Sequence, residues 1–190
     1  MIKTLIFTAT YNEKDNIKIL IEKINSLNLK IDILIIDDNS PDKTWEILKE
    51  LEKTMQNLKI IIRNDKSGLD TAHKLAFEFA KNNNYEKFIS MDADLSHDPQ
   101  EIPKMLKILD DFSFVIGSRY IKGGRCEMAG HRLLLSIIGN KIIKKVLGLT
   151  CNEFTTSYRG FNIKKLGDFN LNIIQSKGYS FFMETIYRLH

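Results

Sequence analysis

The sequence predicts an α/β fold in which a largely parallel, Rossmann-like sheet is flanked by helices. Short apolar segments alternate along the chain with longer segments whose apolar residues recur at helical spacing, as in parallel strands joined by crossover helices. Residues 31–36 are apolar except for Asp32, as expected for a central strand buried on both faces. Polar clusters follow the strand segments, and ligands of such sheets bind beyond the carboxyl ends of the strands.

The first strand is expected at residues 3–9, where an apolar segment ends at a polar turn. A helix at 16–27 follows, because Ile17, Leu20, Ile21 and Ile24 fall on one helical face. The same two patterns predict the later elements. After the strand at 31–36 these are a helix at 44–55, a strand at 58–63, a helix at 71–82, a strand at 88–91, a helix at 99–110, a strand at 112–116 and helices at 131–149 and 179–190.

Composition excludes several classes of protein. The net charge of +4 over 190 residues is mild and spread along the chain, so no nucleic-acid partner is expected. Cys126 and Cys151 lie far apart without a Cys-x-x-Cys pair, so neither a zinc site nor a disulfide framework is predicted. The chain opens without a signal peptide, and no run approaches the roughly 20 apolar residues of a membrane span. We therefore expect a cytoplasmic protein.

Asp92 and Asp94 form the strongest chemical signal, because they end the apolar strand at 88–91 at spacing i, i+2. Side chains at this spacing share one face of a strand and can converge on one cation. Oxygen ligands select Mg²⁺ or Mn²⁺, which keep several waters and bind substrate phosphates. A solvated acidic turn is the alternative interpretation. Polar clusters at 10–13, 37–42 and 64–70 are predicted to lie at the same sheet edge, which favours a binding site.

The segment at 131–149 carries two stripes at i+4 spacing. The apolar stripe consists of Leu134, Ile138, Ile142 and Val146. The polar stripe consists of Arg132, Ser136, Asn140 and Lys144. A helix of this kind either packs on the core or lies at a membrane surface, with its lysines near anionic headgroups. In both cases the polar stripe is available to hold an anion.

Six motifs occur in an order that resembles family 2 glycosyltransferases, and more closely the polyprenyl-phosphate glycosyltransferases of the dolichol-phosphate mannosyltransferase group. They are Thr10-Tyr11-Asn12-Glu13, Ile36-Asp37-Asp38-Asn39-Ser40-Pro41-Asp42, Met91-Asp92-Ala93-Asp94-Leu95-Ser96-His97, Gly117-Ser118-Arg119-Tyr120, the Arg132/Ser136/Asn140 spacing, and Thr155-Thr156-Ser157-Tyr158-Arg159. The resemblance covers essentially the whole chain.

The resemblance implies a single GT-A domain over residues 1–190. Residues 1–120 would form its nucleotide-sugar-binding half, and residues 121–190 an acceptor-side half that is truncated at its C-terminal end. The implied reaction moves a hexose, mannose or glucose, with inversion from GDP-mannose or UDP-glucose to a polyprenyl or dolichyl phosphate. It would use Mg²⁺ or Mn²⁺, and the protein would bind peripherally at the cytoplasmic face of a membrane.

The same resemblance suggests roles for individual residues. Nucleotide contacts are expected from Thr10, Tyr11, Glu13, Asp38, Asp65 and Asp92. Metal ligands are expected to be Asp92, Asp94 and Ser96. Asp94, Arg119 and Arg132 are the catalytic candidates, and the acceptor phosphate is expected to meet Arg119, Arg132, Ser136 and Arg159, because arginine suits bidentate phosphate contacts. Glu184 matches an acidic position of the family without a role that the sequence explains.

Three positions depart from the family pattern, and one of them is Asp98, which replaces a common proline. Asp70 stands where a glycine is usual after the third strand, and Ser157 stands where the later motif usually has glycine. These departures leave open a module that binds sugar nucleotides without turnover, and a family 2 enzyme with a soluble or polysaccharide acceptor is a further alternative. A phosphorelay receiver is a third alternative, suggested by Asp37 and Asp38 after the second strand; the pattern disfavours it, because a receiver has its acidic pair after the first strand and a lysine after the last, and neither occurs here.

Overall fold

The computed structural model describes residues 3–121, 123–124 and 130–190, without the side chains of residues 132 and 133. The chain forms two compact units. One comprises residues 1–115 and 157–173, and the other residues 116–156 and 174–190. This division differs from the expected halves that meet at residue 120, because the chain returns to the first unit for residues 157–173.

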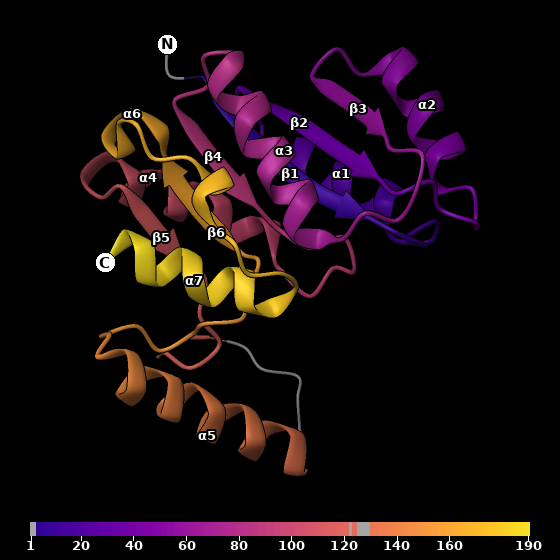
Figure 1. The fold of residues 1–190 in the computed structure, drawn as a ribbon. Helices are drawn as coiled ribbons and strands as arrows, with labels where there is room; N and C mark the ends of the chain where they lie inside the picture. The colour runs from indigo at the N-terminus through magenta and orange to yellow at the C-terminus, as the bar shows by residue number, and fades with distance from the viewer. Residues whose placement is uncertain (1–2, 122, 125–129) are drawn as a thin grey trace. The chain divides into compact units, whose positions relative to one another are not determined.

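The elements follow the predicted alternation of strands and helices (Figure 1). In chain order they are β1 (Thr4–Thr10), α1 (Ile17–Asn25), β2 (Ile31–Asp37), α2 (Thr44–Thr54), β3 (Leu58–Ile62), α3 (Leu69–Asn82), β4 (Lys87–Ser90), the 3₁₀ helix η1 (Pro99–Glu101), α4 (Ile102–Asp111), β5 (Phe114–Ile116), α5 (Gly130–Leu147), β6 (Arg159–Asn162), α6 (Ile163–Leu166), the 3₁₀ helix η2 (Leu171–Ile173) and α7 (Tyr179–Leu189). The prediction of an α/β fold is confirmed.

The six strands form one sheet in the order β3-β2-β1-β4-β6-β5. Pairing is parallel among β3, β2, β1 and β4, so their carboxyl ends share one edge. The register pairs Thr10 with Asp37, which brings the polar loops after β1 and β2 together. The strand β6 runs antiparallel to β4, with Ser90 opposite Arg159. The sequence did not predict this strand.

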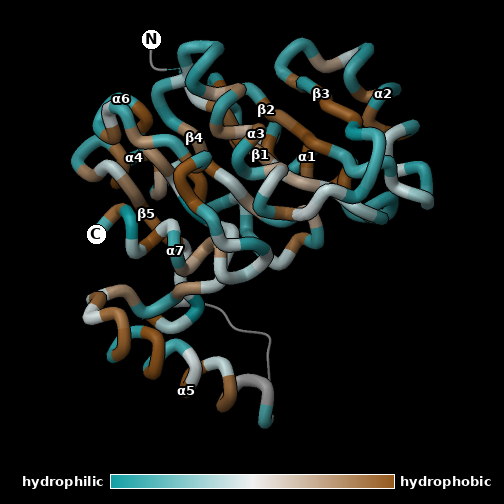
Figure 2. The backbone as a smooth tube through the Cα atoms, viewed as in Figure 1, coloured by the Kyte–Doolittle hydropathy of each residue, from teal (hydrophilic) through white to brown (hydrophobic). Residues whose placement is uncertain are grey.

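Helices cover both faces of the sheet (Figure 1). On one face, Ile6 of β1 packs in a buried apolar cluster that includes Ile21 of α1 and Met105 of α4. On the other face, Phe7 of β1 stacks with Phe88 of β4 at 5.9 Å between ring centroids. Neighbouring residues of β1 thus serve two cores, as expected for a central strand. Figure 2 shows the hydrophobic residues concentrated along the central strands.

The second unit contains α5 and α7. Asn140 connects α5 to the loop before β6, because its Oδ1 accepts the Phe154 N–H at 3.1 Å. The apolar stripe of α5 is exposed, from 43% at Ile138 to 75% at Val146, and Figure 2 shows hydrophobic residues recurring along this helix. This exposure is expected for a helix at a surface and not for a helix whose apolar stripe packs on the core. Among the residues that the structure describes, no helix has both the length and the apolar character needed to cross a bilayer.

Candidate functional site

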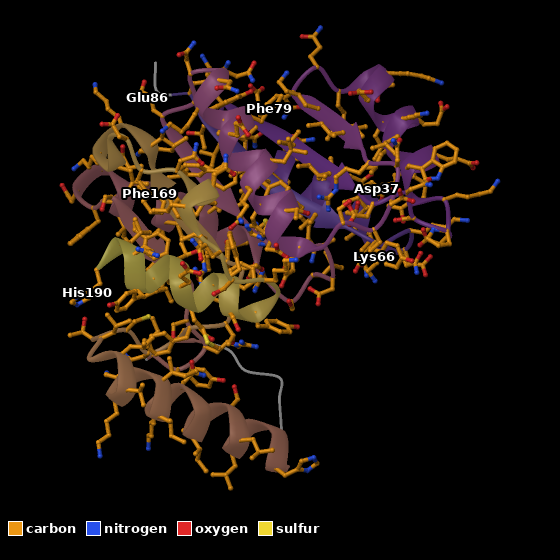
Figure 3. The ribbon with its side chains drawn as sticks, in the orientation of Figure 1. Asp37, Lys66, Phe79, Glu86, Phe169 and His190 are labelled. Carbon is orange, nitrogen blue, oxygen red and sulfur yellow. The ribbon has the colours of Figure 1, made fainter. Side chains whose placement is uncertain are left out.

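The candidate site lies in the first unit, at the carboxyl edge of β1, β2 and β4. In Figure 3, Asp37 and Lys66 are labelled at this edge, and Glu86 lies at the opposite end of the sheet, before β4. The loops after three parallel strands and the carboxylates after β4 therefore reach one rim, as the sequence predicted.

Asp37 joins the loops after β1 and β2. Its side chain is fully buried and accepts hydrogen bonds from Thr10 Oγ1 at 2.8 Å and from Ser40 Oγ at 2.6 Å. Ser40 Oγ in turn accepts the Asn12 N–H at 3.0 Å. Nearby, the Glu13 N–H donates to the side chain of Thr44 at 3.0 Å. The hydroxyl of Thr10, an expected nucleotide contact, thus donates to the buried Asp37 and helps to hold the loops after β1 and β2 together.

Asp38 is held by Arg63, a residue that the sequence analysis did not single out. Arg63 Nε donates to Asp38 Oδ1 at 2.5 Å, and the Ser67 N–H donates to Asp38 Oδ2 at 3.1 Å. Arg63 also donates to the hydroxyl of Thr71 at 2.6 Å and to the carbonyl oxygen of Gly68 at 3.1 Å. A single guanidinium thus binds the end of β2 to the loop that begins α3.

Tyr11, Glu13 and Asp65 lie on the same rim. The Tyr11 ring is 37% exposed, and Lys66 Nζ lies 3.8 Å from its centroid. Glu13 is half-buried, and its Oε2 accepts from Asn16 Nδ2 at 2.9 Å. Asp65 is exposed in the loop after β3. An aromatic face and two carboxylates therefore face the part of the edge that the sequence predicted for a nucleoside.

Asp92 is positioned by contacts on several sides. Its N–H donates to His97 Nδ1 at 3.0 Å, which places the imidazole proton on Nε2. Its Oδ1 accepts the hydroxyl of Ser157 at 2.5 Å. The His97 ring stacks on Tyr158 at 4.9 Å between centroids, so the loop after β4 rests on the segment that enters β6. Burial, followed by the charges of Glu101 and Asp98, raises the pKa of Tyr158, which stays neutral.

Asp94 is exposed, and its Oδ1 accepts the Ser96 N–H at 3.0 Å. The turn engages one carboxylate oxygen of Asp94, and the side chain of Asp92 is 40% exposed. Among the described residues, no three His, Cys, Asp or Glu side chains gather into a metal cage. Two accessible carboxylates fit a hard divalent cation that completes its shell with water and phosphate oxygens.

The predicted acceptor residues divide between the two units. In the second unit, Arg119 Nε donates to the fully buried Glu153 at 3.3 Å, and the Ser136 hydroxyl is hydrogen-bonded to the Tyr120 hydroxyl at 2.5 Å. The side chain of Arg132 lies outside the described part of the structure.

Arg159, a predicted phosphate ligand, is 1% exposed in β6. Its guanidinium carbon lies 5.9 Å from the Phe114 ring centroid, and its charge helps lower the pKa of the buried His73. An enclosed side chain cannot present its donors to a lipid phosphate, so we correct this assignment and regard Arg159 as a core residue. Glu184 accepts the N–H groups of Gln175 and Ser176 at 3.1 and 2.8 Å, which gives this acidic position a structural role.

Arg63, Ser157 and Glu153 take part in these contacts but were not expected to. Arg63 ends a strand at the predicted rim, and that position was the available signal. Ser157 bonds to Asp92, which lies 65 positions earlier in the chain, and Glu153 bonds to Arg119, which lies 34 positions earlier. No spacing rule predicts such pairs. Cys151 is a free thiol, and Cys126 lies outside the described residues.

Comparison with known proteins places this geometry in a family. Residues 5–169 match the model of glycosyl transferase family 2. Over 189 residues the chain is 31% identical to polyprenol monophosphomannose synthase of Mycolicibacterium smegmatis, covering 98% of this chain and 71% of that protein. It is 29% identical to undecaprenyl-phosphate mannosyltransferase of Micrococcus luteus over 98% of this chain and 77% of that protein.

Solved structures share the fold at low sequence identity. S. aureus TarS residues 1–349 match with a TM-score of 0.63 at 17% identity, over 98% of this chain and 55% of that one. The mannosyltransferase PcManGT of Pyrobaculum calidifontis, solved with GDP-Man and Mn²⁺, matches with a TM-score of 0.58 at 16% identity, over 94% of this chain and 50% of that one. The chain thus spans about half the length of these two structures. The fold is the GT-A fold, and the chain belongs to glycosyl transferase family 2.

Proposed function

We propose that this chain is an inverting, metal-dependent glycosyltransferase that moves mannose or glucose from a nucleoside diphosphate sugar to a polyprenyl phosphate. The observation that carries the proposal is the pair of accessible carboxylates, Asp92 and Asp94, at the rim shared with the loops after β1, β2 and β3. The acceptor class is supported by relatives whose names specify polyprenol monophosphomannose and undecaprenyl phosphate.

The nucleoside would bind at the ends of β1, β2 and β3. The exposed Tyr11 ring offers a stacking face, from which a base would displace Lys66. The oxygens of Asp38 already accept from Arg63 and Ser67, but a carboxylate has about four acceptor sites, so Asp38 can also accept a ribose hydroxyl. Glu13 binds Asn16 through Oε2, so its Oε1 can accept from the nucleoside, and Asp65 adds an exposed carboxylate.

Asp92 and Asp94, with the hydroxyl of Ser96, would hold Mg²⁺ or Mn²⁺. A bound cation neutralises the charge that develops on a leaving diphosphate. The protein's contribution is to hold the two carboxylates in place, Asp92 through Ser157 and Asp94 through the turn at Ser96. This fixed geometry spares the reorganisation that flexible acidic side chains would need at the moment of reaction.

The acceptor phosphate would meet Arg119, Arg132 and Ser136. A phosphate nucleophile is already anionic, so positioning it in line with the sugar carbon matters more than a strong general base. Glu153 supports this role of Arg119, because a buried carboxylate holds the guanidinium in one orientation. Asn140 fixes the same helix that carries Ser136 by bonding to the Phe154 N–H.

The exposed apolar stripe of α5 would lie at the cytoplasmic face of a membrane. The stripe continues over four helical positions, and Lys141 and Lys145 are exposed on the same helix. Apolar residues at the acyl boundary and lysines near anionic headgroups are the combination that binds a helix to a bilayer surface. Such contact would bring the enzyme to a polyprenyl phosphate acceptor, whose hydrocarbon chain lies in the bilayer.

The decisive experiment follows sugar transfer from labelled GDP-mannose and UDP-glucose to polyprenyl phosphate, with donor hydrolysis measured in parallel. We expect a lipid-linked hexose of inverted anomeric configuration, no product in excess EDTA, and loss of product in Asp94→Ala. Arg132→Ala should lower transfer while donor affinity stays nearly unchanged. Donor binding with neither product nor hydrolysis would instead identify a binding module, and robust transfer to a soluble sugar would reject the lipid acceptor.

A further inference from the structure

Ser157 touches the carboxylate that is proposed to hold the cation. Its Oγ donates to Asp92 Oδ1 at 2.5 Å, although the two residues lie 65 positions apart in the chain. Ser157 is only 3% exposed, so its hydroxyl has little access to water as a competing partner. A hydroxyl that donates to a carboxylate forms a charge-assisted hydrogen bond, which is shorter and stronger than a neutral one.

The position of this hydroxyl is determined by the sheet. The carbonyl oxygen of Ser157 accepts from Ser90 Oγ at 2.6 Å, and Ser90 is fully buried at the end of β4. In the antiparallel ladder, Ser90 pairs with Arg159, two residues after Ser157. The hydroxyl therefore reaches Asp92 from a rigid strand junction rather than from a flexible loop.

The neighbouring residue reinforces the contact at the other end of the same loop. The Tyr158 hydroxyl donates to the Asp98 carbonyl oxygen at 2.8 Å, and its ring stacks on His97. Residues 157 and 158 thus hold both ends of the loop that runs from Asp92 to Asp98. Asp94, in contrast, is oriented by a turn within its own loop.

We propose that Ser157 is a positioning residue for the divalent cation. Its hydroxyl occupies Asp92 Oδ1 and turns the carboxylate so that Oδ2 is the oxygen presented to the cation. This inference rests on the proposed function, in which Asp92 and Asp94 hold the metal.

The test measures Mn²⁺ affinity directly, by the electron paramagnetic resonance signal of free Mn²⁺, with GDP and separately with UDP present. Partners that orient a metal ligand typically contribute about 10- to 100-fold to metal affinity, so Ser157→Ala and Ser157→Gly should weaken Mn²⁺ binding by about 10-fold or more. Ser90→Ala is the matched control. It removes one buried hydrogen bond from the same junction, but the backbone ladder between β4 and β6 still places the Ser157 hydroxyl beside Asp92, so its Mn²⁺ affinity should stay close to that of the wild type.

Thermal unfolding in EDTA separates positioning from loss of structure. Without metal, the Ser157 variants and Ser90→Ala should have similar melting temperatures. Wild-type Mn²⁺ affinity in both Ser157 variants would overturn the inference and leave the proposed function standing. An equal loss in Ser90→Ala would also overturn it, because general loosening of the junction would then explain the effect. A wild-type protein that binds no Mn²⁺ with either nucleotide would overturn the metal proposal itself, and this inference with it.

Discussion

His73 provides a quantitative test of the core behind the candidate site. The residue lies on α3, is 3% exposed, and packs edge-on against Phe7 at 5.0 Å between ring centroids. Burial disfavours the charged imidazole, and the positive charge of Arg159 disfavours it further, so the pKa of His73 falls from 6.5 to about 3. The folded protein therefore keeps this side chain neutral at every pH above about 3.

The direction of the effect follows from the two pKa values. Between pH 6.5 and pH 3 the unfolded chain binds a proton at His73 that the folded chain does not bind, so stability falls as the pH falls through this range. Each pH unit well inside this range costs about 1.4 kcal/mol. At pH 5, one and a half units below the unfolded pKa, His73 alone should lower the free energy of unfolding by about 2 kcal/mol relative to pH 8.

Urea unfolding at pH 8 and pH 5, followed by far-UV circular dichroism, measures this contribution. We compare the wild type with His73→Gln, which cannot titrate, so that the protonation of carboxylates common to both proteins cancels in the difference. The stability of the wild type should fall by about 2 kcal/mol more than that of the variant between the two pH values. His190→Gln, at the exposed end of α7, is the control and should follow the wild type. A constant difference between wild type and His73→Gln at the two pH values would refute the reasoning.

Three further perturbations test other parts of the molecule. Arg63→Ala should leave the buried Asp38 without its guanidinium partner, destabilise the protein by about 3–5 kcal/mol and weaken nucleotide binding. Urea unfolding measures the first effect and calorimetric titration the second. Unchanged nucleotide affinity would show that Asp38 does not need Arg63 to bind the nucleotide. Gly160→Ala should cost about 1–3 kcal/mol in urea unfolding, because a Cβ at this position would lie 2.8 Å from Val115 Cγ1; a neutral result would mean that β6 can shift. Ile142→Ser on α5 should reduce sedimentation with anionic vesicles at unchanged donor affinity, and full vesicle binding would reject the membrane-surface role of this helix.

The parts of the fold that repeat a simple period could be predicted from the sequence. The helices α1 and α4 follow from apolar residues on one face, and β2 follows from an apolar run that only Asp32 interrupts. The strand β6 could not be predicted in this way. Its four residues, Arg-Gly-Phe-Asn, show neither alternation nor β-branched side chains, and they become a strand only by pairing with β4.

For the site, the sequence located the rim but not the contacts within it. Adjacent acidic residues illustrate the limit, since Asp37 is fully buried and Asp38 is bound by Arg63, and nothing local distinguishes their roles. Arg159 shows the opposite error. Arginine is almost never fully buried, so the expectation of an accessible phosphate ligand was reasonable, and the tertiary packing around β6 overrode it.

The late position of β6 in the chain has a consequence for biosynthesis. When residues 1–156 have left the ribosome, the strands β3, β2, β1 and β4 can already pair, but β4 still has an open edge and β5 still lacks β6, its neighbour in the sheet. An unpaired strand edge is a template for association with other chains. We therefore expect the nascent protein to pass through a stage that exposes this edge to chaperones, and to become able to hold the proposed cation only after Ser157 and β6 have left the ribosome.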